Sequence, residues 1–543
     1  MRTTAQPTST RRAAGIVGVA VIASRLFGLV REVVFTSMFG AGALLDAYYA
    51  AFRIPNLLRD LFAEGALSTA FTTLFTRAWD QEGERPAWEL ANLILTAMTF
   101  LMGALCIVAI IGSPLIVAAF NSGFHNVPGK FELTVQLTRI LFPFILFVSL
   151  AAAVMGMLNA RFVFGVPASA STVFNIVSVI AGVSLAYAFD PGARANWLHP
   201  VFDQRALYGV SLGVLLGGLA QLAMQWPTLH RLGFRFRWRL ALGDPRLKEL
   251  WRLMWPSVIA GSAVQINVLV NSNFASGING GQSWLNCAFR LMQFPIGIFG
   301  VALATATLPA VARAFSRNDM AGFGQTARDS LRLTAFLTLP AAAGLAALAH
   351  PIIALIYQHG HFSAHDTDQT ALALQAYTVG LAGYAAIKVL APCFIAMGLP
   401  KIPLRISLIG IAINLALNLL NAEVLQLGHA GLALTTSCVA LINMVQLAFA
   451  LRKRVDLGDA GRWALYLARC VLAAGLCGGA AWGLNHALEA ATPDRLARAV
   501  GLAGVVGLSV LAYFGAARIL RLRESAQAWA LIAARLPGPV GRR

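Results

Sequence analysis

The chain has 543 residues, of which 58% are hydrophobic and only 12% are charged. A soluble domain carries about 25% charged residues, so this chain has about half the usual supply for solvating its surface. The composition excludes a disordered chain, a collagen and an ordinary soluble globule, and it indicates an all-α polytopic membrane protein. The net charge is +19, from 42 Lys and Arg against 23 Asp and Glu. Nucleic acid is excluded as a partner, because no soluble segment is long enough to form a basic face. Membrane topology or an anionic ligand must therefore explain the charge.

Fourteen stretches are long and apolar enough to cross a bilayer, which takes about 20 residues. In chain order the predicted spans are 14–38, 45–76, 89–119, 133–158, 163–189, 206–229, 250–275, 283–311, 330–357, 370–397, 402–422, 430–450, 463–486 and 499–520. With the N-terminus inside, cytoplasmic segments contain 30 of the 42 basic residues and external loops contain five, among them Lys130. This positive-inside bias predicts that both termini are cytoplasmic.

Charged residues concentrate in the first two spans, although a charge at mid-bilayer costs several kcal/mol. Such residues can reach the interface or pair structurally, and they can also line a water-filled cavity. Cations outnumber acids here, and surplus guanidinium groups suit a phosphate because Arg forms bidentate bonds with oxyanions. The charges in or near the spans are Arg25, Arg31, Glu32, Asp46, Arg53, Arg59, Asp60, Glu64, Arg139, Arg290 and Lys388.

Short matches recur at a constant offset of 237 residues, as in the Ala-Phe-Arg that ends at Arg53 and the one that ends at Arg290. The offset predicts two parallel six-helix lobes around a midplane cavity, which is a transporter architecture. The predicted parts are an N-lobe (1–229), a basic cytoplasmic linker (230–252), a C-lobe (253–454) and two further helices with a basic cytoplasmic tail (455–543).

Three smaller patterns favour structural interpretations. The six cysteines all lie in apolar runs and are predicted to be small buried side chains. Gly209–Val210–Ser211–Leu212–Gly213 matches the nucleophile motif G-x-S-x-G, but no strand precedes it. The histidines between spans nine and ten, with Asp366 and Asp368, could hold a metal, yet the acids fit the first turn of span ten better.

Several motifs resemble those of the MurJ/MviN lipid II flippases, a family of the multidrug/oligosaccharidyl-lipid/polysaccharide exporter superfamily. The resemblance covers essentially the whole chain, and its most specific part is the PNLLR and FAEGA pair. The motifs are SRLFGLVRE at 24–32, DAYYAAFRIPNLLR at 46–59, FAEGA at 62–66, RLMQFPIG at 290–297, YQHGHF at 357–362 and KVLAP at 388–392.

The resemblance implies a V-shaped pair of lobes that moves undecaprenyl-diphosphate-linked peptidoglycan precursor from the inner to the outer leaflet by alternating access. It implies a role in cell-wall biogenesis, cell shape and division, a place in the bacterial inner membrane, and a C-terminal helix pair that guides the lipid tail. The implied headgroup-binding residues are Arg25, Arg31, Arg59 and Arg290, with Arg53 beside them; the implied charge partners are Glu32, Asp46, Glu64 and Lys388.

The resemblance also bears on which ion gradient or potential drives transport. Some relatives bind sodium, for which the residues here are Asn267, Asn414 and Asn418, without the carboxylate that a hard cation prefers. No cofactor is expected, and Na⁺, H⁺ or the membrane potential alone could drive transport. The chain departs from the family at Phe289 and Gln293, where acids or Asn are common, and this puts the charge partner of Arg290 in doubt.

The expected partners are lipid II, anionic inner-leaflet lipids and cell-wall synthesis enzymes, and the protein is expected to be a monomer. Two transport alternatives share the fold: a flippase for another polyprenyl-linked glycan, and a drug antiporter. A membrane glycosyltransferase that uses Asp366 and Asp368 with a metal is an alternative from another class, although the external loops are short for such a domain. A passive scaffold for cell-wall enzymes is a third.

Overall fold

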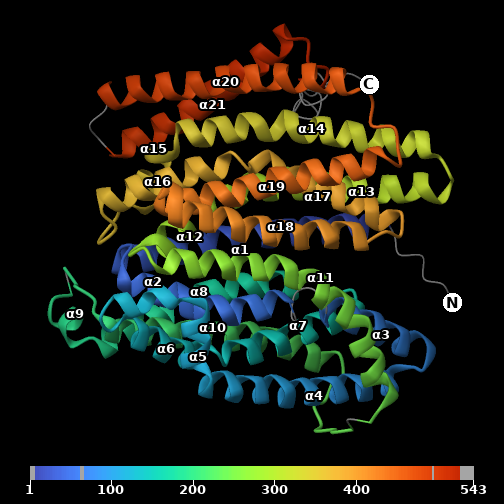
Figure 1. Ribbon diagram of the computed structural model, residues 1–543. Helices are drawn as coiled ribbons and strands as arrows, with labels where there is room; N and C mark the ends of the chain where they lie inside the picture. Colours follow the sequence, from blue (N-terminus) through green and yellow to red (C-terminus); the bar gives the residue numbers. More distant parts are fainter. Residues whose placement is uncertain (1–6, 62–66, 198, 242, 492–494, 526–543) are drawn as a thin grey trace, which may run out of the picture. The chain divides into compact units, whose positions relative to one another are not determined.

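The computed structural model describes residues 7–61, 67–197, 199–241, 243–491 and 495–525 (Figure 1). Within these ranges the chain is helical with no strand, which confirms the all-α class. By their internal contacts the residues form two compact units, each described here by itself: unit 1 is Met1–Ser283 with His359–Phe362, and unit 2 is Trp284–Gln358 with Ser363–Arg543.

Unit 1 contains the helices from α1 to α11 and the first residues of α12. They are α1 (Pro7–Phe39), α2 (Ala43–Leu58), α3 (Ser68–Gln81), α4 (Glu84–Ile111), α5 (Ser113–Phe120), the 3₁₀ turn η2 (Ser122–Asn126), α6 (Lys130–Leu141), α7 (Phe144–Ala160), α8 (Gly165–Phe189), α9 (Pro191–Ala195), α10 (Gln204–Arg231) and α11 (Pro245–Ser276).

Unit 2 contains the remaining helices, two of which continue into π-helical turns. They are α12 (Gly281–Pro295), the π turn η3 (Ile296–Gly300), α13 (Val301–Ser316), α14 (Met320–Ala347), α15 (Ala349–Tyr357), α16 (Ala364–Thr378), α17 (Leu381–Ala396), α18 (Lys401–Leu420), the π turn η4 (Asn421–Leu425), α19 (Gly428–Arg452), α20 (Ala460–Ala491) and α21 (Arg495–Ile519).

Among the described residues, ten helices are long and apolar enough to cross a membrane, and the bent pair α16–α17 makes eleven if it is one span. The other three predicted spans coincide with α1, with α2 and α3, and with α11, which do not meet that criterion. The multi-pass membrane character is therefore confirmed, whereas the number fourteen stays a prediction.

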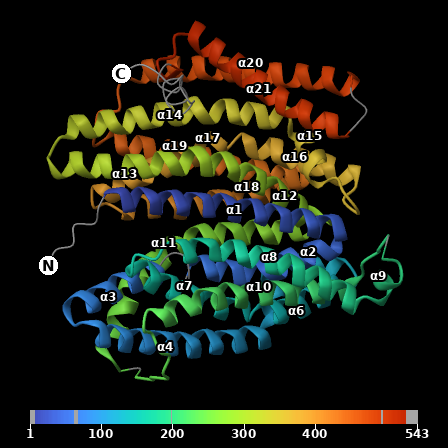
Figure 2. The ribbon, with the colours of Figure 1, turned by 180° about the vertical axis from the view of Figure 1, so that it is seen from behind.

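In unit 1, α8 and α10 lie side by side along their lengths (Figures 1 and 2). Small residues let their backbones approach, as is usual for helices packed in a membrane. A Cβ at Gly213 would overlap the backbone of Gly182, and a Cβ at Gly209 would overlap that of Leu185. The G-x-S-x-G sequence is thus a packing stripe of α10, in agreement with its structural interpretation.

The connection between α8 and α10 is fixed by one buried carboxylate. Asp190 accepts hydrogen bonds from the backbone N–H groups of Gly192 (3.0 Å), Ala193 (3.1 Å) and Asp203 (2.8 Å). Burial raises the pKa of the Asp190 carboxyl, but the three N–H donors favour the ionised form more strongly and hold that pKa below its ordinary value. The loop is therefore organised around a negative charge.

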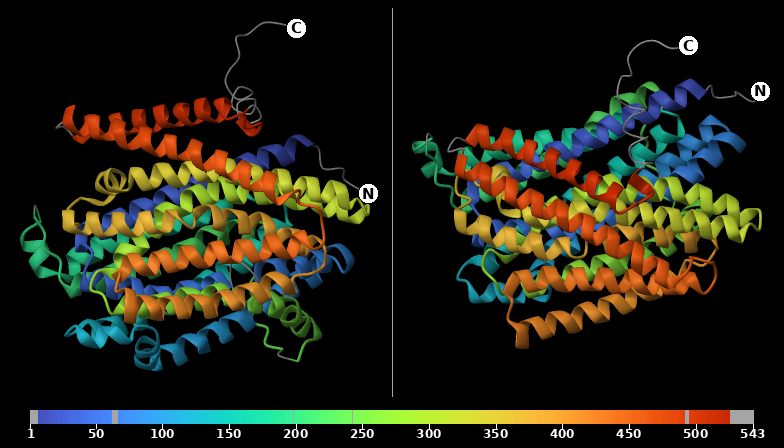
Figure 3. Two further views of the ribbon diagram at one scale, coloured as in Figure 1. Left: turned by 45° about the horizontal axis from the view of Figure 1, so that its top comes forward. Right: turned by 90° about the horizontal axis from the view of Figure 1, so that it is seen from above.

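In unit 2, α20 packs on α14 and α21 packs on α20 (Figure 3). Two tyrosine hydroxyls join these helices: Tyr466 donates to the carbonyl of Arg332 (2.8 Å), and Tyr513 donates to that of Phe336 (2.6 Å). Large apolar side chains such as Leu476 and Val500 stay exposed on the pair, as expected for helices that face lipid. The predicted C-terminal helix pair exists, and its role as a guide for the lipid tail stays a prediction.

The contact-based boundary differs from the predicted lobe boundary by one helix. The C-lobe was predicted to begin at 253, but α11 belongs to unit 1, and unit 2 begins at Trp284. The last part of the predicted linker is also helical, because α11 begins at Pro245. Compact units and sequence repeats are different divisions of a chain, so the predicted pair of six-helix lobes stays a prediction.

Candidate functional site

The three predicted site residues of α1 differ in their surroundings. Arg25 is exposed, whereas Glu32 is buried. The Arg31 guanidinium lies over two aromatic rings, 5.0 Å from the ring centre of Phe174 and 5.9 Å from that of Phe52. Stacking on an aromatic face suits the planar guanidinium, and it fixes the direction in which the charge points.

Asp46 on α2 is fully buried and forms an ion pair with Lys130, whose Nζ lies 2.8 Å from Oδ2. Three further groups donate to the same carboxylate: the Gly280 N–H (2.8 Å), the Ser283 N–H (2.9 Å) and the Ser283 hydroxyl (2.7 Å). Every lone pair of the carboxylate is thereby engaged, as a buried charge requires. Asp46 consequently joins α2, the start of α6 and the turn between α11 and α12.

Lys130 is the partner that sequence reasoning missed. It was counted as a basic residue of an external loop, but it is the first residue of α6 and its side chain is only 1% exposed. The ammonium also lies 4.3 Å from the ring centre of Phe124, and Asn279 Oδ1 lies 3.5 Å from it. Asp46 and Lys130 are 84 positions apart in the sequence, so no local pattern indicates that they form a pair.

The C-terminal end of α2 carries the next predicted residues. Arg53 is half-buried on α2, and a π-helical turn at 59–61 follows the helix. In that turn the Arg59 guanidinium forms an ion pair with the adjacent Asp60 carboxylate at 2.8 Å. Glu64 lies outside the described residues. A π turn often marks a functional position, because it redirects side chains without breaking the helix.

Arg290 and Lys388 belong to unit 2, on α12 and α17. Arg290 is half-buried and Lys388 is exposed. Pro295 ends α12 and the π turn η3 follows it, so the helix that carries Arg290 is irregular beyond that residue. The grouping of Arg290 with the arginines of unit 1 stays a prediction.

The asparagines proposed for sodium divide between the units. Asn267 lies on α11 in unit 1, whereas Asn414 and Asn418 lie buried on α18 in unit 2. The Asn418 amide donates to Asn414 Oδ1 (2.9 Å), and the Thr435 hydroxyl donates to Asn418 Oδ1 (2.5 Å). The two amides of α18 thus share one hydrogen bond, whereas the buried Asn414 Nδ2 has no hydrogen-bond partner among the described residues, and a sodium site stays a prediction.

The loop between α15 and α16 has a structural explanation. Asp366 forms a capping box with Ser363 at the start of α16 and accepts a hydrogen bond from the Trp284 indole (3.0 Å). Asp368 pairs with His350 at 3.2 Å. Within the described ranges, no three His, Cys, Asp or Glu side chains gather closely enough to hold a metal ion. The first-turn interpretation is confirmed for Asp366, whereas Asp368 lies beyond the first turn of α16.

The motif loop 359–362 docks on α1. The His361 N–H donates to the Ser37 carbonyl (2.8 Å), and the His361 ring nitrogen Nε2 lies 3.0 Å from the Pro200 carbonyl oxygen. Gly360 has φ +58° and a Cβ there would overlap Ser37, so only glycine fits without strain. The loop thereby belongs to unit 1, although the helices that flank it belong to unit 2.

The predicted linker is held on α4. The Asn92 amide donates to the Arg235 carbonyl (3.1 Å), and its oxygen accepts the Arg237 N–H (2.8 Å). One helical turn later, the Thr96 hydroxyl accepts the Arg239 N–H (3.1 Å). Because these helix positions are four apart, they face the same extended backbone segment and fix it along α4. The linker is an ordered part of unit 1.

Basic and aromatic side chains alternate along this segment. Arg235 and Arg237 are exposed, whereas Phe234 is buried in the core of unit 1, and Trp238 contacts Phe100 on α4 with 65% of its surface exposed. At the end of the segment, Arg246 donates to the Asp244 carboxylate and lowers the pKa of that carboxyl. Exposed arginine beside exposed tryptophan is typical of a membrane–water interface.

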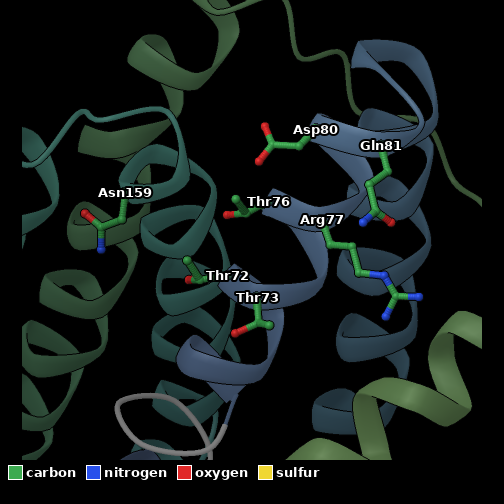
Figure 4. A pocket seen from close by; sticks show the side chains of 7 residues that line it. All are labelled: Thr72, Thr73, Thr76, Arg77, Asp80, Gln81 and Asn159. Atoms are coloured by element: carbon green, nitrogen blue, oxygen red, sulfur yellow. The ribbon is translucent and has the colours of Figure 1, made fainter. Parts of the chain in front are cut away.

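An open surface groove that sequence reasoning missed lies between α3 and α7 in unit 1, and polar side chains stand along it although much of its accessible lining is apolar. Figure 4 shows Thr76 and Asp80 on α3 pointing toward the side of Asn159, while Arg77 and Gln81 lie on the other side of α3. The cavity has a volume of about 680 Å³. The signal was present in the sequence, because polar residues recur on α3 at helical spacing. The lining residues are Thr72, Thr73, Thr76, Arg77, Asp80, Gln81 and Asn159.

Comparison with known proteins identifies the family. The sequence profile of the family described as Lipid II flippase MurJ matches residues 35–494. The chain is 32% identical over 517 residues to a probable lipid II flippase MurJ of Vibrio cholerae, covering 94% of this chain and 95% of that protein. It is 34% identical over 500 residues to the lipid II flippase MurJ of Burkholderia cenocepacia, covering 91% and 94%.

Solved structures agree in fold. The structure of lipid II flippase MurJ in an inward closed conformation matches with a TM-score of 0.75 at 24% identity, covering 93% of this chain and 98% of that one. An inward-facing multidrug transporter of the MATE family matches with a TM-score of 0.66 at 14% identity, covering 79% and 94%. These neighbours are transporters, and the likeness shows the fold alone. By its matched profile and its near full-length relatives, the chain belongs to the lipid II flippase MurJ family.

Proposed function

We propose that the protein is a lipid II flippase, which moves undecaprenyl-diphosphate-linked peptidoglycan precursor from the inner to the outer leaflet of the bacterial cytoplasmic membrane. The observation that supports this most strongly is the match of the chain to lipid II flippases over more than nine-tenths of its length. The arginines of α1 and α2 supply the chemistry, because a diphosphate needs several guanidinium donors to leave water.

The residues proposed to bind the diphosphate of the headgroup are Arg25, Arg31, Arg59 and Arg290, with Arg53 as a further candidate. The aromatic rings around Arg31 restrict its guanidinium, so less freedom is lost when it binds an anion. Arg59 exchanges Asp60 for phosphate, which turns an existing ion pair into a binding contact. Alternating access then exposes the headgroup outward while the polyprenyl tail stays in lipid.

Both termini lie in the cytoplasm, and the basic segment of the linker rests on the inner leaflet. The exposed Arg235 and Arg237 attract anionic headgroups, and Trp238 inserts at the interface. The protein acts as a monomer that exchanges substrate with cell-wall synthesis enzymes. Transport is driven by the membrane potential or by a gradient of Na⁺ or H⁺, which flipping assays with defined gradients would separate.

The test is the outward accessibility of lipid II in vesicles that contain the purified protein. Arg25→Ala and Arg290→Ala are expected to reduce flipping at least tenfold, because each removes a charge-assisted contact worth about 1.5–3 kcal/mol. Arg139→Gln is the matched control, since the Arg139 side chain already donates to the Ser113 hydroxyl at 3.0 Å. Undiminished flipping by both alanine variants would overturn the assignment of these arginines.

Complementation separates the proposal from its closest rival. A strain depleted of its own lipid II flippase should grow when it expresses this chain. A transporter of another polyprenyl-linked glycan, or a drug antiporter of the same fold, would not restore growth.

A further inference from the structure

The helix α3 presents two chemically different faces. Phe71, Leu74 and Phe75 are buried in the core of unit 1, and they anchor the helix against its neighbours. The opposite face carries Thr72, Thr76 and Asp80, which recur four residues apart and line the pocket (Figure 4). Thr72 and Thr76 lie at the end of the predicted span 45–76 and Asp80 lies beyond it, so this face is accessible to water and to a polar ligand.

The lining of the pocket excludes a phosphate site. The hydroxyls and the amides of Gln81 and Asn159 are neutral, and the lining contains one guanidinium, that of Arg77. That guanidinium already pairs with Glu249 on α11 at 2.8 Å. Threonine hydroxyls and carboxamides both donate and accept hydrogen bonds, which matches a ligand rich in hydroxyl and amide groups. The volume of about 680 Å³ is in the range of small-molecule sites.

Asp80 adds a charge preference to the pocket. Its side chain is exposed, and no hydrogen bond or ion pair joins its carboxylate to another residue in the part of the chain that the structure describes. A carboxylate at the edge of a neutral polar cavity favours a ligand that carries an ammonium group there. The pocket therefore suits a sugar or peptide with a free amine.

We infer that this pocket binds the sugar–peptide part of the lipid II headgroup, separately from the arginines that bind the diphosphate. The inference rests on the proposed function and extends it, because it gives the protein a second point of recognition on the same substrate. Thr72, Thr76 and Asn159 bind hydroxyl and amide groups of the headgroup, and Asp80 binds the free amine of the stem peptide. Undecaprenyl diphosphate lacks the sugars and the peptide, so the pocket does not contribute to its binding affinity.

The experiment compares the binding of two probes, lipid II and undecaprenyl diphosphate, to the purified full-length protein. The double variant Thr72→Val/Thr76→Val keeps the side-chain shape and removes two hydroxyls, so the affinity for lipid II should fall about tenfold. Its affinity for undecaprenyl diphosphate should stay unchanged, which also shows that the protein is folded. Thr99→Val is the matched control, because that hydroxyl donates to the Leu95 carbonyl of its own helix outside the pocket.

A second variant tests the amine. Because the Asp80 side chain is exposed, the Asp80→Asn protein should fold normally. Its affinity for lipid II should be about threefold lower than that of the wild type, as expected for the loss of an exposed ion pair. Lipid II acetylated on the side-chain amine of its stem peptide should bind the wild type about as weakly as unmodified lipid II binds Asp80→Asn. The affinity of Asp80→Asn for the acetylated lipid should be no lower than its affinity for unmodified lipid II. An additive loss would overturn the assignment of Asp80.

The outcomes also separate the inference from the function on which it rests. If the wild type flips lipid II but the threonine variant binds both probes as the wild type does, the pocket assignment is wrong and the flippase proposal stands. If the affinity of the threonine variant falls equally for both probes while that of Thr99→Val falls for neither, the pocket binds the diphosphate part and the inference is again wrong. If the wild type does not flip lipid II in vesicles where a known flippase does, the proposed function itself fails.

Discussion

The buried pair of Asp46 and Lys130 gives the sharpest stability prediction. Lys130→Met removes the ammonium but keeps most of the side-chain volume, and it leaves the carboxylate with the two N–H donors and one hydroxyl that remain. Breaking a buried ion pair from one side costs about 3–5 kcal/mol. Because three donors still solvate the carboxylate, the loss should be at the lower end, about 3 kcal/mol.

The reverse change should cost more. Asp46→Asn keeps a carbonyl oxygen near the ammonium but removes its counter-charge, and the new NH₂ group faces N–H donors that lose their acceptor, so we expect a loss of about 4 kcal/mol. The double variant has no buried charge at this position. It should therefore be at least 2 kcal/mol more stable than the sum of the two single losses predicts.

The assay is denaturant-induced unfolding of the purified protein in detergent, followed by helical circular dichroism at one pH for all four proteins. The expected order of stability places the wild type first and Lys130→Met second, and the double variant should lose no more than about 5 kcal/mol instead of the roughly 7 kcal/mol that additive losses would give. A loss under 1 kcal/mol for Lys130→Met, or additive losses in the double variant, would refute the view that the pair is a buried, mutually dependent unit.

Three other changes test packing, the linker and a pH effect. Gly213→Ala should destabilise the protein by about 1–3 kcal/mol in the same unfolding assay, because its Cβ would overlap α8, whereas Gly103→Ala, with open space around it, should be neutral or slightly stabilising. Asn92→Ala should speed hydrogen exchange of the Arg237 amide at least tenfold by mass spectrometry, since that N–H loses its acceptor; unchanged exchange would mean that the linker is held elsewhere. Asp190→Asn should lower the thermal midpoint by a constant amount above about pH 5, and the difference should shrink below about pH 4. The sign follows from the lowered pKa, because the contribution of the wild-type carboxylate is complete above its unfolded pKa and is lost as the pH falls through the folded one. A difference that grows in acid would contradict it.

Sequence reasoning predicted the features that depend on local pattern. The all-helical class follows from long apolar runs, and the place of Asp366 in the first turn of α16 follows from the preference of acids for helix N-termini. The buried state of five of the six cysteines follows from their apolar neighbours, and Cys438 is half-buried. Each of these can be read from a window of about 20 residues.

The features that escaped prediction depend on residues far apart in the chain. Lys130 looked like a loop charge, because nothing near it in sequence shows that Asp46 will meet it. The attachment of the linker to α4 could not be predicted, because the groups that hold it belong to Asn92 and Thr96, more than 140 residues earlier. The polar face of α3 was visible, but only the packing of its apolar face shows which side is left open.

The clamp on α4 also has a consequence for the order of biogenesis. Asn92 and Thr96 leave the ribosome well before the linker segment that they hold, and the groups that complete the Asp46 site end at Ser283. Nearly every contact of unit 1 is thus available before unit 2 is synthesised, and only the short loop His359–Phe362 arrives later. Unit 1 can assemble as a folding unit during translation, as is common for N-terminal domains. Its ordered linker then presents a basic, aromatic edge while the rest of the chain is still being synthesised.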